Sequence, residues 1–156
     1  MQINVIHIYG GSGSGTSTLG YAFSRESGYY FMDADDYLWL PTNPRFTQMR
    51  ESGERVRLMK EDIKEHKKVV ISGSVTGWGD PLIPMFDLAV RLVTDVDIRI
   101  ARIKTRESER FGDRILPGGD MYKQHQDFLE WAAAYDTGDV TVSYTHLRAH
   151  ETLRHL

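Results

Sequence analysis

The feature that most constrains this chain is a glycine-rich turn placed between an apolar run and an amphipathic segment. Residues 3–9 are almost all apolar, which is typical of a strand buried on both faces of a parallel sheet. The turn that follows, at residues 10–17, reads GGSGSGTS. From residue 19 onwards apolar residues recur at helical spacing as far as Gly28, a suitable helix end. The sequence therefore predicts a strand, a glycine loop and a helix in direct succession.

The turn fits the pattern G-x-x-x-x-G-K-[ST] at every fixed position except the lysine, where Thr16 stands. In such a loop, backbone N–H groups turn inward around phosphate oxygens, and the following helix adds its positive N-terminal end. Neither effect needs the lysine. The Ser17 hydroxyl is placed to reach Mg²⁺, and Thr18 to reach an α-phosphate oxygen. The predicted phosphate-binding residues are Gly10, Gly11, Ser12, Gly13, Ser14, Gly15, Thr16, Ser17 and Thr18.

Two other interpretations of the loop are weaker. A flexible turn uses the same residues, but it does not require a buried strand before it and a helix after it. A dinucleotide-binding G-x-G-x-x-G beginning at Gly11 has Thr16 where the third glycine belongs. Asp33 could serve as the acidic residue of that pattern, although no lone acidic residue follows at the usual spacing.

The rest of the chain alternates short apolar runs with amphipathic segments, which predicts parallel βαβ units and a three-layer α/β fold. Residues 111–120, rich in glycine, are expected to form a mobile loop without regular structure. Thr94 or Asp95 is expected to cap the helix before that loop. Further strands are predicted at residues 29–32, 69–71 and 88–93, and helices at residues 51–65, 95–110 and 121–135. The last helix is expected to place Phe128, Leu129, Trp131 and Ala132 at apolar positions.

Four segments of this chain resemble the small P-loop kinases: adenylate, shikimate and gluconate kinase. They are GGSGSGTSTLG, DADDYLW after the second strand, SGSVTGWGDP after the third, and the stretch from RESERFGDR to the end of the resemblance near residue 139. The resemblance implies a P-loop NTPase fold with a parallel sheet flanked by helices. It also implies transfer of the γ-phosphoryl group of ATP, with Mg²⁺, to a nucleoside monophosphate or a small hydroxylated metabolite. The missing lysine departs from this pattern.

Asp33 is the first candidate catalytic residue, because it ends the second strand, where open α/β sheets place their ligands. In the kinases that the chain resembles, an aspartate there orients the acceptor or holds metal-bound water, so Ser17 and Asp33 are the predicted metal residues. Asp36 is a candidate for substrate binding. The competing interpretation of each aspartate is a helix cap or a solvated loop charge.

Arginines around the glycine-rich segment 111–120 resemble those of a kinase lid that closes over the phosphates. Arg106, Arg110 and Arg114 are predicted to supply the positive charge that the loop lysine would otherwise give. The alternative is a surface ridge in which these arginines pair with Glu107 and Glu109, which would contribute little.

The segment at residues 73–80 stands where related kinases carry an acceptor-binding glycine loop. Gly73 and Trp78 are therefore candidates for substrate binding, although core packing is the alternative for the indole. Arg50 and Arg55, near the charged helix, are candidates for an acceptor phosphate, with a solvated surface as the alternative.

The composition of the chain limits the kinds of partner and chemistry that can be expected of it. The formal net charge of −3 gives no reason to favour nucleic acid or an anionic membrane, and the absence of cysteine excludes thiol chemistry. A nucleotide and a small-molecule acceptor in the cytoplasm are the expectation, and the oligomeric state is left open. Because Thr16 replaces the lysine, a non-catalytic nucleotide-binding module or a nucleotide hydrolase stays an alternative to a kinase.

The last fifteen residues, VSYTHLRAHETLRHL, resemble one reading frame of the transposon-end adapter used in preparing sequencing libraries. We therefore expect a P-loop kinase-like domain at residues 1–141, lacking its last strand, and a non-native tail at residues 142–156. Four tail residues that imitate a metal or phosphate cluster are discounted: His146, Arg148, His150 and His155.

Overall fold

The structure is a computed structural model and describes residues 1–137. Its centre is a parallel sheet of four strands: β1 (Val5–Gly10), β2 (Tyr30–Asp33), β3 (Val69–Ser72) and β4 (Leu88–Leu92). The strand order is β2-β3-β1-β4, so β3 lies between the first two strands of the chain. The dinucleotide-binding fold has β2 next to β1, and this order therefore excludes that interpretation of the glycine loop.

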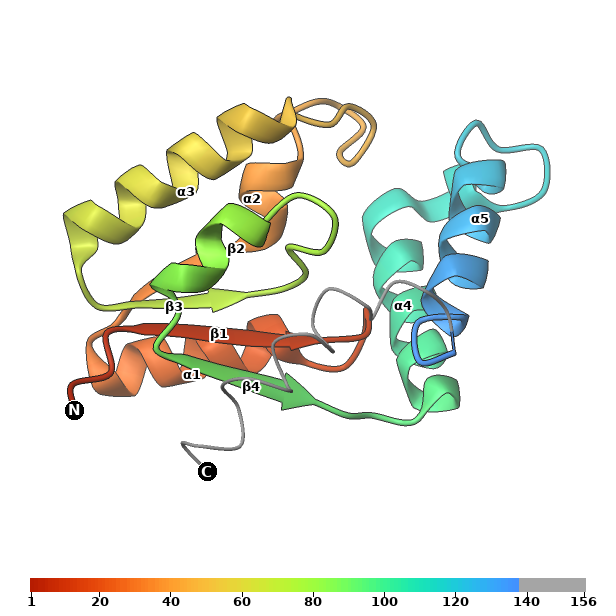
Figure 1. Cartoon of the computed structure of the whole chain (residues 1–156). Coiled ribbons are helices and arrows are strands. Elements are labelled where there is room, and N and C mark those ends of the chain that lie inside the picture. Colours follow the sequence, from red (N-terminus) through yellow and green to blue (C-terminus); the bar gives the residue numbers. More distant parts are fainter. Residues whose placement is uncertain (138–156) are drawn as a thin grey trace.

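Helices cover both faces of the sheet, which confirms the predicted α/β fold (Figure 1). Helix α1 packs on one face, and α2 and α3 on the other, while α4 and α5 stand beyond the carboxyl ends of the strands. The bounds are α1 Thr16–Ser27, α2 Ala34–Leu38, α3 Ser52–His66, α4 Val96–Phe111 and α5 Tyr122–Ala133, with short 3-10 helices η1 Asp80–Met85 and η2 Gly112–Ile115.

The core follows from the alternation of side chains along β1, the central strand. Val5 and Tyr9 point to the face covered by α2 and α3, where they join Met32, Met59 and Leu82. The residues between them, Ile6 and Ile8, point to the opposite face and pack with Val70. A strand buried on both sides is what the almost continuous apolar run predicts.

The structure settles one open alternative about the elements and corrects two expectations. Of the two structural alternatives left open for the acidic cluster, the helix cap is the one that Asp33 adopts, at the start of the short helix α2. The glycine-rich segment 111–120 does contain regular structure: α4 continues to Phe111, and η2 follows because the buried Ile115 anchors it. In α5, Ala132 is buried as predicted, but Trp131 is 44% exposed, and the second buried position is the polar His125.

Within residues 1–137, no helix combines the length and the apolar character needed to cross a membrane. The predicted tail at residues 142–156, and any strand after α5, lie outside the described residues.

Candidate active site

The phosphate loop runs from the end of β1 to the start of α1 at the carboxyl edge of the sheet. Gly13 and Gly15 have φ of +82° and +97°, values that side chains rarely tolerate, so glycine is required for the shape of this turn. A Cβ atom at Gly10 would lie 2.6 Å from the carbonyl oxygen of Leu92, so β4 also limits this end of the loop. The amide of Ser14 donates back to the Gly11 carbonyl at 3.0 Å and closes the turn.

Three successive carbonyl groups of the loop each accept a hydrogen bond from a side chain between β4 and the middle of α4. Arg99 Nη1 donates to the Ser12 carbonyl at 3.4 Å, and Arg102 Nη1 to the Gly13 carbonyl at 3.1 Å. Thr94, expected as a helix cap, instead donates its hydroxyl to the Ser14 carbonyl at 3.3 Å. Asp95 occupies the cap position of α4 without a side-chain bond.

The residues after the glycines connect the loop to the acidic cluster. The Ser17 hydroxyl donates to Asp33 Oδ2 at 3.3 Å. The Thr16 carbonyl accepts a bond from the Ser72 hydroxyl at 2.9 Å, which fixes the first turn of α1 against β3. Thr18 is exposed beside them. Two oxygens of the kind that Mg²⁺ prefers, from Ser17 and Asp33, therefore lie together at the loop.

The two carboxylate oxygens of Asp33 have different partners, and only the helix-cap interpretation is visible directly in its contacts. One carboxylate oxygen meets Ser17, and the other accepts the backbone N–H of Asp35 at 3.0 Å as the cap of α2. Asp35 keeps an exposed face, yet the protein around its carboxyl group removes enough water to raise its pKa to about 6. The charge of Asp33 adds to this shift, and those of Arg106 and Arg110 oppose it.

Asp36, a predicted substrate residue, lies on the outer side of α2. Its carboxylate is 3.8 Å from the guanidinium of Arg45, and both side chains are exposed. Partial burial and the charge of Asp33 raise the pKa of Asp36. The cluster therefore holds three carboxyl groups, and the pKa of Asp35 is the one that is raised most.

The structure separates the three predicted lid arginines. Arg106 Nη2 donates to the Ser12 hydroxyl at 3.4 Å and faces Asp35. Arg110 lies over the Phe46 ring, 5.4 Å from its centroid, and burial followed by the charge of Arg106 lowers its pKa. Arg114 is bound by both carboxylate oxygens of Asp120, at 2.9 and 2.6 Å. Arg114 is thus engaged in a surface ion pair with Asp120, and its predicted service to the loop stays a prediction.

Of the residues predicted to bind the acceptor, some lie near the acidic cluster and one packs in the core. Gly73 lies against the start of α2, where a Cβ atom would be 3.2 Å from that of Ala34 and 4.0 Å from Asp33 Oδ1. Arg50 donates from Nε to the Tyr37 carbonyl at 3.0 Å, a structural contact near the same cluster. Trp78 is 7% exposed and packs in the core, with the Arg55 guanidinium 5.7 Å from its ring centroid. The core interpretation of Trp78 is the one that this position supports.

Two donors at the phosphate loop are enclosed by protein and have no hydrogen-bond partner among the described residues: the Ser14 hydroxyl and Arg106 Nε. An enclosed donor without an acceptor costs free energy, so such groups need an explanation. An anionic ligand in the loop would supply acceptors.

Sequence reasoning missed Arg99 and did not choose Asp35. Arg99 is the most deeply buried charged residue described, at 1% exposure. The signal for it was present, because residues 99, 102 and 106 follow the i, i+3, i+7 spacing of one helix face. Only the packing of α4 against the loop gives that spacing its meaning.

These features define the class of protein: an α/β chain with the P-loop NTPase fold in its kinase-like form. Solved structures with this fold include shikimate kinase from Acinetobacter baumannii in complex with shikimate, which is 16% identical with a TM-score of 0.50 over 95% of this chain and 93% of that one. A sugar kinase from Janibacter sp. is also 16% identical with a TM-score of 0.50, over 68% of this chain and 69% of that one.

The uncharacterized protein YqaC of Bacillus subtilis (strain 168) is 44% identical to this chain over 145 residues, which cover 93% of this chain and 80% of YqaC. The chain belongs to the YqaC family. No model of a known protein family matches it.

Proposed function

We propose that this protein is an ATP-dependent phosphotransferase that passes the γ-phosphoryl group to a small hydroxylated metabolite or a nucleoside monophosphate. The observation that carries the proposal is the Ser17–Asp33 contact of 3.3 Å, which joins the phosphate loop to the acidic cluster at one edge of the sheet. A phosphate-binding loop alone would serve any nucleotide-binding protein. A loop joined to carboxyl groups supports phosphoryl transfer to an acceptor.

In this proposal the loop amides and the N-terminal end of α1 bind the phosphates, and Ser17 with Asp33 holds Mg²⁺. Mg²⁺ supplies neutralisation of the charge on the phosphate oxygens. Asp33 orients the acceptor, and Asp35 accepts the proton of its hydroxyl group, because a raised pKa matches a general base to near-neutral pH. Arg106 and Arg110 place positive charge beside the transferred group.

The test is acceptor-dependent release of ADP from Mg²⁺-ATP, measured by a coupled assay over panels of polyols, hydroxy acids and nucleoside monophosphates. Asp35→Asn should still bind ATP in calorimetric titration and should lose transfer by about a hundredfold or more. ADP release that ignores every acceptor would instead support a nucleotide hydrolase. ATP binding without any turnover would support a non-catalytic binding module, the alternative that Thr16 favours.

A further inference from the structure

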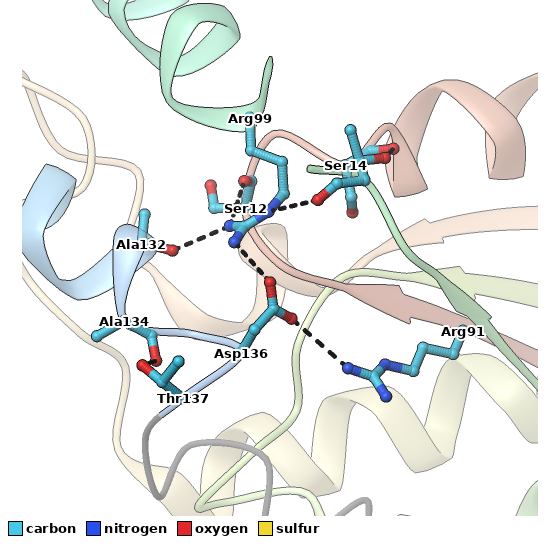
Figure 2. A network of polar contacts seen from close by, with 9 residues as sticks. Ser12, Ser14, Arg91, Arg99, Ala132, Ala134, Asp136 and Thr137 are labelled. Atoms are coloured by element: carbon cyan, nitrogen blue, oxygen red, sulfur yellow. Dashed lines mark hydrogen bonds and ion pairs between the residues drawn. The ribbon is translucent and has the colours of Figure 1, made fainter. Parts of the chain in front are cut away.

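Arg99 is a fully enclosed cation beneath the phosphate loop. Its guanidinium group donates to the carbonyl groups of Thr94 at 3.1 Å, Ser12 at 3.4 Å and Ala132 at 2.9 Å, and it pairs with Asp136 at 3.0 Å (Figure 2). The guanidinium group therefore divides its donors between one described carboxylate, Asp136, and three backbone carbonyl groups. Burying a charged group is costly, so a cation in this position is unusual unless the contacts that it makes are needed.

The guanidinium group fits against the loop itself. A Cβ atom at Gly11 would lie 2.6 Å from Arg99 Nη1, so the absence of a side chain at Gly11 lets the cation approach the backbone. The C=O and N–H groups of a trans peptide point in opposite directions. Because Arg99 binds the Ser12 carbonyl, the N–H group of Gly13 points away from Arg99. Thr94 fixes the N–H group of Gly15 in the same way through the Ser14 carbonyl.

From this geometry we propose that Arg99 is a positioning residue for phosphate binding: it holds the Ser12–Gly13 peptide in the orientation that presents the Gly13 amide to an anion. A loop lysine would contact the ligand directly, whereas Arg99 acts from the protein side through the backbone. The contact with Ala132 ties the same peptide to the end of α5, and Asp136 completes the support. This inference deepens the proposed function and rests on it for the identity of the anion.

The experiment has one readout that needs no ligand and one that does. The backbone order parameter of the Gly13 amide, from ¹⁵N relaxation of the ligand-free protein, should fall from about 0.85 to below about 0.6 in Arg99→Lys. A lysine cannot reach the carbonyls and Asp136 together, because it lacks the planar fork. The dissociation constant for ATP, from calorimetric titration, should rise by about tenfold or more.

Two matched controls separate positioning from stability. Arg91→Lys changes a residue that shares Asp136, at 3.6 Å, without a described contact to the loop, and should leave the Gly13 order parameter unchanged. Ile103→Val changes a fully buried residue of the same helix and should lower stability while it keeps every described hydrogen bond of Arg99. Asp136→Asn retains Arg99 while weakening its support, and should loosen Gly13 in the same direction as Arg99→Lys but less.

A rigid Gly13 in both Arg99→Lys and Asp136→Asn would overturn the inference, and so would equal loosening by Ile103→Val. Failure of the proposed function gives a different result: the wild-type protein would not bind ATP, while Gly13 would still lose its order in Arg99→Lys.

Discussion

Single residues of the phosphate loop differ in what they contribute. Gly15 supplies a backbone shape, since its φ of +97° lies where a side chain is strained even though a Cβ atom would meet nothing within 4 Å. Thr16 is the first residue of α1, and its carbonyl group accepts a hydrogen bond from the Ser72 hydroxyl. The loop should therefore depend on the first residue for its geometry and only slightly on the side chain of the second.

We predict that Gly15→Val removes ATP binding, whereas Thr16→Ala weakens it by less than about threefold. The valine forces the turn out of its left-handed conformation, and the alanine keeps the backbone as it is. Calorimetric titration of both variants measures the difference. Equal losses would show that the Thr16 side chain is a direct ligand of the nucleotide.

The raised pKa of Asp35 predicts how the stability of the protein depends on pH. The folded protein raises the pKa of Asp35 from 3.8 to about 6, so the carboxyl group binds its proton more tightly folded than unfolded. The favourable contribution is full below pH 3.8 and is lost as the pH rises through about 6. Asp35→Asn should therefore be more stable than the wild-type protein at about pH 8, with an advantage that shrinks towards about pH 4. Urea unfolding at several pH values measures this trend, and a constant difference would contradict the assigned shift.

Helix α4 carries the three arginines that contact the phosphate loop. Its arginines at 99, 102 and 106 contact the loop from one face, whereas Arg114 follows the helix and pairs with Asp120. Membership of a glycine-rich, arginine-bearing segment therefore does not show which arginines contact the loop, whereas position along the helix does.

Arg106→Ala should lower kcat by about tenfold or more with a smaller change in the KM for ATP, because its charge is needed chiefly in the transition state. Arg114→Ala, the matched change in an exposed ion pair, should alter kcat by less than about twofold. Steady-state kinetics with a responsive acceptor provide both values. The opposite ranking would return Arg114 to the role that the sequence predicted.

Within residues 1–137, the larger of the two hydrophobic clusters lies on the sheet face that α2 and α3 cover. Leu82 has no exposure there and packs in one cluster with Met32, Met59 and Ile71. The core supports the edge of the sheet at which the candidate site residues lie, and none of the proposed site residues belongs to this cluster.

Leu82→Ala should therefore lower the free energy of unfolding by about 2–5 kcal/mol through the cavity that it leaves. Leu116→Ala, at a residue that is 52% exposed, is the control and should cost less than about 1 kcal/mol. Denaturant titration gives both values, and the ATP affinity of folded Leu82→Ala should stay within about threefold of the wild type. A similar cost for both leucines would contradict the assignment of the core.

The sequence by itself determined the elements whose signals are local. The apolar run before Gly10, the glycine pattern and Gly28 predict β1, the loop and the end of α1, because backbone conformation and burial on both faces leave their mark in adjacent residues. The acidic residues after β2 and the arginines of α4 were visible too. Their sequence positions did not show which of them would meet.

Tertiary structure decided those meetings, because they depend on which elements pack together. The order β2-β3-β1-β4 brings Asp33 to Ser17, and the docking of α4 against the loop brings in Arg99 while leaving Arg114 outside. Trp78 likewise became a core residue only through the contacts of the loop after β3. Burial and pairing are set by residues far apart in the chain, and no local pattern records them.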